Sequence, residues 1–323
     1  MSNPPVTLSA IQEARRRIVN IAYRTPLYFS PRLSDITNAK VYPKLECYQP
    51  IRVFKIRGAA NKILKLSPEE RKRGLVAASS GNHGLAVSYL AKLTGSEATI
   101  VVPTNAVEEK VRAIEEYGAT VVKHGLFHDE RLSKALEIQK STGATMIQPF
   151  DDADVIAGQG TIGLEIFEDM PDVNTVIVPI GGGGLISGIA TALKSLKPSV
   201  KIIGVEPEKA PKMSQSIKNG KITCLSDTSS IADGLIAREP GVLTFELVKQ
   251  NVDEIVLLSE EQIEKALFIT MRECHLVIEP SAAAAVAGLL EKAHPKSGEK
   301  VVVVVSGGNV SLKILAKIIE KYA

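Results

Sequence analysis

The chain has 323 residues, of which 45% are apolar and 23% are charged, and its formal net charge is +3. This length allows one large core or two moderate ones, and the small net charge without a dense basic block argues against a nucleic-acid partner. No segment reaches the roughly 18 apolar residues that a membrane-spanning helix needs. The three cysteines form no CxxC pair, so neither a disulfide framework nor a zinc site is indicated. We therefore expect a cytoplasmic protein that contacts neither membrane nor nucleic acid.

Short β-rich runs alternate with amphipathic segments along the whole chain. The expected strands cover residues 98–102, 120–123, 175–178, 201–205 and 301–305. The expected helices cover residues 8–22, 82–94, 107–117, 132–142, 183–196, 260–274 and 281–292. This order predicts an α/β fold made of open parallel sheets with helices on both faces. The last strand is the continuous run VVVVV, which indicates burial on both of its faces.

Two polar segments suggest a division into two domains. The first is Lys72-Arg73-Gly74, and the second is FDDADV at residues 150–155. If both segments are hinges, residues 74–152 form an inserted small domain, and residues 1–73 plus 153–323 share the large one.

The first segment with chemical character is FKIRGA at residues 54–59. Its lysine, Lys55, stands among apolar and small residues, and burial there would disfavour its charge and lower its pKa. A lysine of this kind is suited to form a Schiff base with an aldehyde. The alternative is a lysine that extends its ammonium group to solvent from the start of a helix.

A second segment, SSGNHG at residues 79–84, lies between the apolar run Leu75–Ala78 and a predicted helix. Small residues at such a turn let the backbone approach a ligand, and free N–H groups at the helix start suit a carboxylate or a phosphate. Asn82 has a side chain that can bond a phenolic oxygen. Plain helix capping by Ser and Asn is the alternative.

The third segment is a run of four glycines, Gly181, Gly182, Gly183 and Gly184, between a predicted strand and a predicted helix. A backbone cradle for a phosphate at the positive end of a helix explains this run. The segment matches neither the P-loop nor the dinucleotide fingerprint, which favours a ligand with a single phosphate. The alternative is a flexible linker.

The fourth segment, SGGN at residues 306–309, follows the VVVVV strand, where ligands of parallel sheets bind. Ser306 has a hydroxyl that can meet a ring nitrogen, whereas a tight turn is the structural alternative. Together the four segments describe one ligand, which needs a lysine for its aldehyde, a glycine cradle for its phosphate and two side chains for its ring. Pyridoxal 5'-phosphate meets all of these requirements.

At these segments the chain resembles the fold type II pyridoxal-phosphate enzymes (the tryptophan synthase β-like fold), most nearly serine racemase and the threonine and serine dehydratases. The motifs that carry the resemblance stand in the family's order: KLECYQP, FKIRGA, ASSGNHG, IAGQGTIGLEI, PIGGGGLISG, GVEP, ADG, IEPSAA and VVSGGNV. The resemblance implies two domains, with residues 1–73 plus 153–323 as the one that binds the cofactor.

The resemblance also implies a role for each candidate residue. Lys55 would carry the cofactor and act as acid and base on one face, and Ser80 would be the second acid and base on the opposite face. Phe54 would pack on the ring, Asn82 would bond the ring hydroxyl, Gly181–Gly184 would hold the phosphate, and Ser306 would meet the pyridine nitrogen. The substrate carboxylate would be held by Ser79, Ser80, Gly81, Asn82 and His83, with help from Arg131. Glu279 would lie near the ring, or else cap the helix that follows it.

The implied reaction is dehydration and deamination of L-threonine or L-serine to a 2-oxo acid and ammonia. A hydroxyl partner such as Ser306 leaves the ring nitrogen largely unprotonated, and elimination tolerates the resulting weaker electron sink. The alternatives are an amino-acid racemase that uses Lys55 and Ser80, a 3-hydroxyaspartate ammonia-lyase, and a ligand sensor without catalysis. Relatives of this kind imply a homodimer or homotetramer.

Two positions depart from the family pattern. Val53, after Arg52, stands where the family has a serine, which puts a hydroxyl contact to the cofactor in doubt. The racemases bind a divalent cation through positions that correspond to Glu206, Ala210 and residue 212, which is a lysine here. We expect the ammonium group of Lys212 to pair with Glu206 in place of the cation, and therefore little or no dependence on magnesium or calcium.

Overall fold

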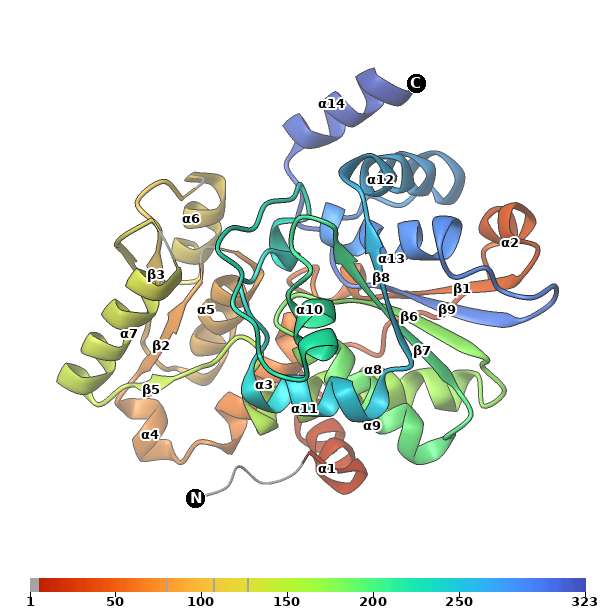
Figure 1. Ribbon diagram of the computed structural model, residues 1–323. Helices are drawn as coiled ribbons and strands as arrows, with labels where there is room; N and C mark the ends of the chain where they lie inside the picture. The colour runs from red at the N-terminus through yellow and green to blue at the C-terminus, as the bar shows by residue number, and fades with distance from the viewer. Residues whose placement is uncertain (1–5, 80, 107, 127) are drawn as a thin grey trace.

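Two parallel β-sheets organise the computed structural model, which describes residues 6–323 except residues 80, 107 and 127 (Figure 1). The larger sheet has the strand order β1-β9-β6-β7-β8, with β1 at Lys40–Leu45, β9 at Lys300–Val305, β6 at Thr175–Pro179, β7 at Lys201–Pro207 and β8 at Glu254–Leu258. The smaller sheet has the order β4-β3-β2-β5, with β4 at Thr120–Lys123, β3 at Ala98–Val102, β2 at Leu75–Ala78 and β5 at Thr145–Met146. Every strand pair in both sheets is parallel, so the predicted α/β class is confirmed.

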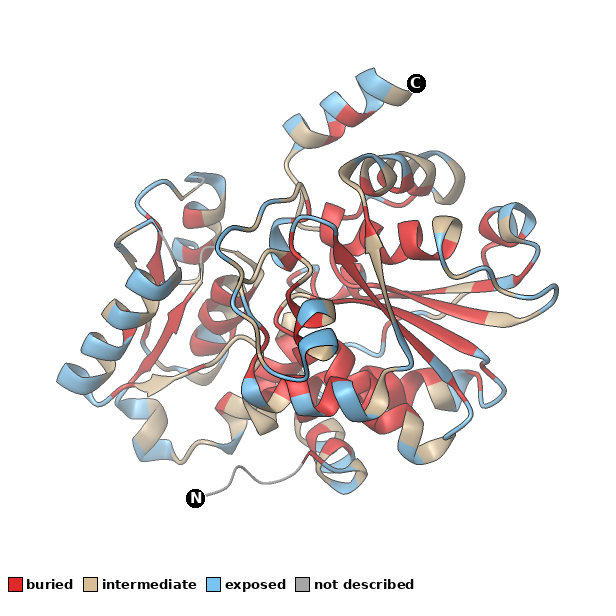
Figure 2. Ribbon diagram, in the orientation of Figure 1, coloured by how far each residue is buried: buried red, intermediate tan, exposed pale blue. Residues whose placement is uncertain are grey.

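Strand β9, an interior strand of the larger sheet, shows why a continuous apolar run is needed there. Val301, Val303 and Val305 pack with the helices α12 (Glu260–Cys274) and α13 (Pro280–Glu291). Val302 and Val304 face the opposite core, formed with α8 (Ala153–Asp169) and α9 (Gly184–Leu196). Because successive side chains of a strand point to opposite faces, both faces of β9 are buried. Figure 2 shows the buried strands between the two helix layers.

The smaller sheet also has helices on both faces. Helices α5 (Asn82–Thr94) and α6 (Glu108–Glu115) pack with one face, and α7 (His128–Thr142) packs against the other. Helix α3 (Lys55–Lys65) joins the core of the first face through Ile56, Ala60 and Ile63, although it precedes all four strands of this sheet in the chain. The core of the smaller sheet is therefore continuous with the helix that begins at Lys55.

The expected elements agree with the structure in existence and type. Ser259 begins α12 with a capping box completed by Gln262. The first helix ends earlier than expected, and α7 begins earlier, at His128. The remaining elements are α1 (Leu8–Ile18), α2 (Pro31–Thr37), η1 (Glu46–Tyr48), α4 (Pro68–Lys72), α10 (Lys212–Asn219), η2 (Asp233–Leu235), α11 (Val242–Asn251) and α14 (Leu312–Tyr322). All strands of the smaller sheet come from residues 75–146, and the exact domain boundaries stay a prediction.

A buried network of charges connects α3 with its neighbours. The guanidinium of Arg57 donates to Glu46 at 2.8 and 2.9 Å and to Glu165 at 2.6 and 2.9 Å. Lys44 donates to Glu165 at 2.6 Å and to the carbonyl of Thr25 at 2.7 Å. The opposite charges hold the pKa of Glu46 below its usual value, although burial raises it. The network ties the first turn of α3 to η1 and α8.

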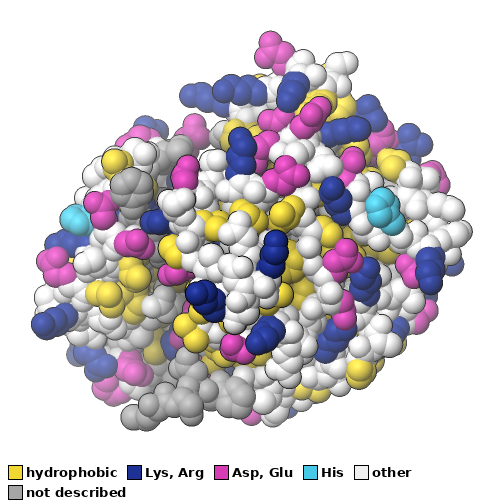
Figure 3. All heavy atoms as spheres, viewed as in Figure 1, with side chains coloured by type: hydrophobic (Ala, Val, Ile, Leu, Met, Phe, Trp, Pro, Cys, Tyr) yellow, Lys and Arg dark blue, Asp and Glu magenta, His cyan; other side chains and the backbone are white. Residues whose placement is uncertain are grey.

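Positive and negative side chains alternate over the face of the molecule in Figure 3 and form no large area of one sign. This distribution agrees with the small net charge. In the described part of the chain, no helix combines the length and apolar character needed to cross a bilayer.

Candidate active site

The candidate site lies at the carboxyl ends of neighbouring strands, where parallel sheets collect ligands. Strands β6 and β9 are adjacent, so the glycine run after β6 and Ser306 after β9 meet at the same edge. The backbone N–H of Phe54 donates to the carbonyl of Ser306 at 3.0 Å, and Gly308 N–H donates to the carbonyl of Arg52 at 2.8 Å. These bonds hold the lysine segment against the end of β9.

Lys55 is the first residue of α3 and is only partly accessible. Its Nζ donates to the carbonyl of Pro149 at 2.6 Å and lies 5.1 Å from the centroid of the Phe54 ring. Burial lowers the pKa of Lys55 to about 8, although the negative charge of Glu279 raises it. At pH 7 about one molecule in ten then has a neutral amine, against about one in three thousand at an ordinary pKa. Lys55 is therefore suited to attack an aldehyde, as the sequence predicts.

The glycine run has no room for side chains. A Cβ at Gly182 would lie 2.4 Å from the ring of Phe150, and one at Gly181 would lie 2.6 Å from the carbonyl oxygen of Gly234. Gly183 has a φ of 101° and directly precedes α9 without a side-chain cap. The first N–H groups of a helix have no partner within the helix, and the helix dipole favours an anion there. The run therefore fits the phosphate group of pyridoxal phosphate.

The loop before α8, which contains the second predicted hinge segment, lies next to the glycine run. Phe150 packs on Gly182 and Gly184. Asp151 accepts from the first N–H groups of α11, at 3.0 Å from Val242 and 2.9 Å from Leu243. Sequence reasoning missed this role, because the contacts join segments about ninety residues apart in the chain.

Asn82 begins α5 and faces Glu279 across the site. Its Nδ2 lies 3.0 and 2.9 Å from the two carboxylate oxygens of Glu279, and its Oδ1 accepts from Asn309 at 2.8 Å. Burial raises the pKa of Glu279 to about 7, and the bonds from Asn82 oppose this shift. The side chain of Glu279 makes no capping bond to α13, and its position near the cofactor ring stays a prediction. Asn309 is a further polar residue that sequence reasoning did not select.

The substrate-binding candidates of the second segment are only partly brought together. The side chain of Ser79 accepts from the N–H of Gly81 at 3.3 Å. His83 is buried, and its Nε2 lies 2.8 Å from the carbonyl oxygen of Ile147. Burial lowers the pKa of His83 to about 3, and the charge of Lys55 adds to this effect, so the imidazole is neutral at ordinary pH. Ser80, the expected second acid and base, lies outside the described residues.

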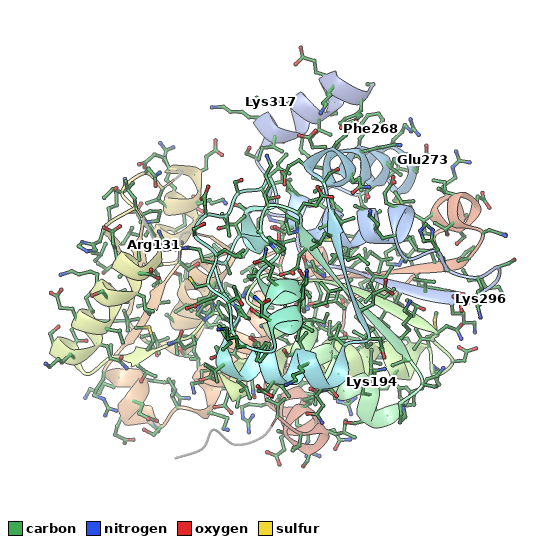
Figure 4. All side chains as sticks on the ribbon, viewed as in Figure 1. Arg131, Lys194, Phe268, Glu273, Lys296 and Lys317 are labelled. Atoms are coloured by element: carbon green, nitrogen blue, oxygen red, sulfur yellow. The ribbon has the colours of Figure 1, made fainter. Side chains whose placement is uncertain are left out.

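Arg131 lies in the first turn of α7, on the smaller sheet's side of the molecule (Figure 4). Its Nη1 donates to the carbonyl of Leu126 at 3.0 Å, and its Nε is buried with no hydrogen-bond partner among the described residues. Burial lowers the pKa of Arg131. The bond to Leu126 keeps the guanidinium within its own loop, so its substrate role stays a prediction.

The expected pair of Lys212 and Glu206 is present in the larger sheet's unit. The Nζ of Lys212 lies 3.0 Å from Oε1 of Glu206 and 3.3 Å from the carbonyl oxygen of Ala210, and both charged side chains are fully buried. Burial lowers the pKa of Lys212, whereas the Glu206 carboxylate raises it. Among the described residues, no group of three or more His, Cys, Asp or Glu side chains is arranged to hold a metal ion. The metal requirement stays a prediction.

The site combines a lysine of lowered pKa with a glycine run whose backbone N–H groups can bind an anion, at the carboxyl edge of a parallel sheet. This combination is typical of enzymes that bind a phosphorylated aldehyde cofactor. The family model described as "Pyridoxal-phosphate dependent enzyme" matches residues 18–307, and the chain belongs to this family.

Two relatives with curated names match nearly the whole chain. The L-threonine ammonia-lyase of Thermotoga maritima is 47% identical over 98% of this chain and 79% of its own length. A catabolic L-threonine dehydratase of Staphylococcus aureus is 46% identical over 98% of this chain and 92% of its own.

Solved structures agree with this assignment. Maize serine racemase superposes with a TM-score of 0.93 at 38% identity, over 99% of this chain and 98% of that one. The processed threonine deaminase isoform 2 of Solanum lycopersicum has a TM-score of 0.92 at 35% identity, over 100% of this chain and 97% of that one. The predicted family and fold type are therefore confirmed.

Proposed function

We propose that this protein is a pyridoxal-phosphate-dependent ammonia-lyase that converts L-threonine, L-serine or both to a 2-oxo acid and ammonia. The observation that supports the proposal is the environment of Lys55: burial lowers its pKa, and its Nζ donates to the carbonyl of Pro149, whose neighbour Phe150 packs on Gly182 and Gly184. The names of the relatives from Thermotoga maritima and Staphylococcus aureus support the same reaction.

The residues that would hold the cofactor follow from the geometry. Gly181–Gly184 would bind the phosphate, Phe54 would contact the ring, and Ser306 would meet the ring nitrogen. The Nδ2 of Asn82 has two hydrogens, so it can keep a bond to Glu279 and donate the other to the ring oxygen. When bound, pyridoxal phosphate supplies an electron sink for negative charge at the substrate Cα.

The chain's own groups would then move the protons. A neutral Lys55 can remove the Cα proton, because its pKa lies near working pH. The free N–H groups at the start of α5 would hold the substrate carboxylate. Loss of the substrate hydroxyl takes the electron pair with it, and water then completes release of the 2-oxo acid and ammonia.

Serine racemase activity is a second candidate, supported by the similarity to maize serine racemase at 38% identity over 99% of this chain. It requires a proton donor on the face opposite Lys55, and Ser80 is the residue we propose. A ligand sensor without catalysis has no need of an amine with a lowered pKa.

The decisive experiment is borohydride treatment of the purified protein, followed by peptide mass spectrometry. The reduced cofactor should be found on Lys55, and Lys55→Ala should lack the absorbance of about 410–420 nm that protein-bound pyridoxal phosphate gives. Cofactor mass at another lysine, or at none, would contradict the proposal. Assays of 2-oxo acid from threonine, serine and 3-hydroxyaspartate would identify the substrate.

Chiral analysis of serine after incubation separates the two candidate activities. Absence of D-serine at every time point excludes racemisation. If Ser80 is the second acid and base, Ser80→Ala should lose action on D-serine while keeping part of the turnover of L-serine. Equal loss of both would instead assign Ser80 to substrate binding.

We further propose a cytoplasmic location and a homodimer or homotetramer. The three free cysteines support a reducing compartment. Exposed apolar side chains such as Phe29, Ile36, Val277 and Leu312 support an interface between copies. Light scattering after size exclusion would measure the number of subunits.

A further inference from the structure

Lys212 has an environment that resembles a bound cation rather than an ordinary lysine. Its side chain is fully buried, and four oxygens surround its Nζ. They are the carbonyl oxygens of Ile180 at 2.7 Å, Leu235 at 2.8 Å and Ala210 at 3.3 Å, and Oε1 of Glu206 at 3.0 Å. We call these four oxygens the oxygen cage.

The cage requires the charged form of Lys212. An ammonium group has three hydrogens to donate, and the carbonyl and carboxylate oxygens around it can only accept hydrogen bonds. A neutral amine would turn a lone pair toward a carbonyl or carboxylate oxygen, which is repulsive in a buried place. Glu206 completes the arrangement, because its oxygens also accept from the N–H groups of Met213 at 3.0 Å and Ser214 at 2.9 Å.

The oxygens come from segments that form the phosphate cradle. Ile180 directly precedes Gly181, and Leu235 ends η2, whose Gly234 carbonyl lies against Gly181. Met213, the neighbour of Lys212, lies against Gly183 through its Cε. The ammonium group of Lys212, at the start of α10, therefore bonds both the residue before the glycine run and the end of η2, which lies against that run.

We propose that Lys212 is a positioning residue for phosphate binding, an internal cation that sets the conformation of Gly181–Gly184. The cage left when its side chain is removed should accept a small ammonium ion in its place. This inference rests on the proposed function for the identity of the phosphate ligand. The cage itself does not depend on that identity.

The test compares Lys212→Ala with Lys194→Ala in the full-length protein. Lys194 is a matched control, since its Nζ bonds the carbonyl of Val200 at 2.7 Å and Asp253 at 2.9 Å but lies near the far end of α9 (Figure 4). Lys212→Ala should raise the dissociation constant for pyridoxal phosphate about tenfold or more, and Lys194→Ala should leave it within about twofold. Equal effects of the two substitutions would overturn the proposal.

Chemical rescue distinguishes an internal cation from general packing. Methylammonium should lower the dissociation constant of Lys212→Ala and raise the melting temperature of its cofactor-free form. Tetramethylammonium at the same ionic strength has no N–H group and should do neither. If neither quantity responds to methylammonium, the cage does not act as a cation site, and the proposal is wrong.

A second variant covers the case in which Lys212→Ala fails to fold. The double substitution Lys212→Met with Glu206→Gln keeps the volume and removes both charges, so it leaves no unpaired ion. It should fold, bind pyridoxal phosphate weakly and ignore methylammonium. Wild-type cofactor affinity in this variant would overturn the proposal. If the wild-type protein binds no pyridoxal phosphate, the proposed function fails, and the melting temperatures still test the cage.

Discussion

Asn82 donates its side-chain amide to both carboxylate oxygens of Glu279, at 3.0 and 2.9 Å, although the two residues are 197 positions apart in the chain. Asn82 is the first residue of α5, which packs on the smaller sheet. Glu279 directly precedes α13, which packs on the larger sheet. Asn309 closes the group by donating to Asn82 at 2.8 Å. The two sheets therefore meet in a polar cluster whose carboxylate is buried.

Glu279→Gln should change the pH dependence of stability. Because burial raises the pKa of Glu279 to about 7, the folded protein holds a proton that the unfolded chain has lost above its ordinary pKa of 4.5. The stability from this residue is complete below about pH 4.5 and falls by about 3 kcal/mol as pH rises to about 7. Burial of neutral His83 contributes stability that rises with pH over part of the same range, and it does so in both proteins. In urea unfolding of the cofactor-free proteins between pH 5 and 8, the free energy of unfolding of the wild type minus that of Glu279→Gln should therefore fall as pH rises. Parallel curves for the two proteins would contradict the raised pKa.

The rate of cofactor uptake should report the lowered pKa of Lys55. Only the neutral amine attacks an aldehyde, so uptake by the cofactor-free protein should rise with pH and level off above about 8. Glu279→Gln should move this midpoint to lower pH, because the charge of Glu279 raises the pKa of Lys55. Stopped-flow absorbance measures both curves. A wild-type midpoint near 10 would mean that Lys55 is not desolvated.

The fold was accessible from the sequence because its signals are local. Both faces of β9 are buried, and the five valines at 301–305 show this directly in the sequence. Residues 181–184 have no room for a Cβ, and the four glycines show this too. The short strand β5 and the partly buried edge strand β8 have no comparable signal, and neither was expected. Their pairing depends on neighbouring strands rather than on their own residues.

The site was accessible only in part, because its contacts span the chain. The bond of Lys55 to Pro149 joins positions 94 apart. His83 is neutral because it is buried, and nothing in the sequence around it indicates that burial. Glu206 and Lys212 are closer in sequence, and their pairing was expected. The carbonyl oxygens of Ile180 and Leu235, which also bind Lys212, were not expected. Every residue has a backbone carbonyl, so the sequence does not show which of them will accept a bond.

Gly182→Ala should weaken both folding and cofactor binding. Its Cβ would lie 2.4 Å from the Phe150 ring, so the ring or the loop must move. We expect a loss of about 1–3 kcal/mol in the free energy of unfolding, as for other overpacked sites. In a Phe150→Ala background the same substitution should cost less, because the obstructing ring is absent. Denaturant unfolding of the four proteins forms a double-mutant cycle, and strict additivity would exclude the clash.

Removal of Arg57 should be among the most destabilising single changes. Arg57→Met leaves Glu46 and Glu165 buried without their main partner, and breaking such a buried pair costs about 3–5 kcal/mol. The exposed pair of Lys134 and Glu137 is the control, and Glu137→Gln should change stability by less than about 1 kcal/mol. Chemical denaturation measures both. A small loss in Arg57→Met would mean that the network adds little to the stability of this fold.

Ser306→Asp should shift the balance between elimination and racemisation. A hydroxyl at this position leaves the ring nitrogen of a bound pyridine largely unprotonated, whereas a carboxylate would hold a proton there and strengthen the electron sink. A stronger sink lengthens the life of negative charge at Cα, which gives time for a proton to return from the other face. The ratio of D-serine to 2-oxo acid formed from L-serine should therefore rise in Ser306→Asp, and Ser306→Thr, which keeps a hydroxyl, should retain the wild-type ratio. Chiral chromatography with a coupled 2-oxo acid assay measures this ratio, and an unchanged value in a variant that still binds cofactor would show that Ser306 does not control the ring nitrogen.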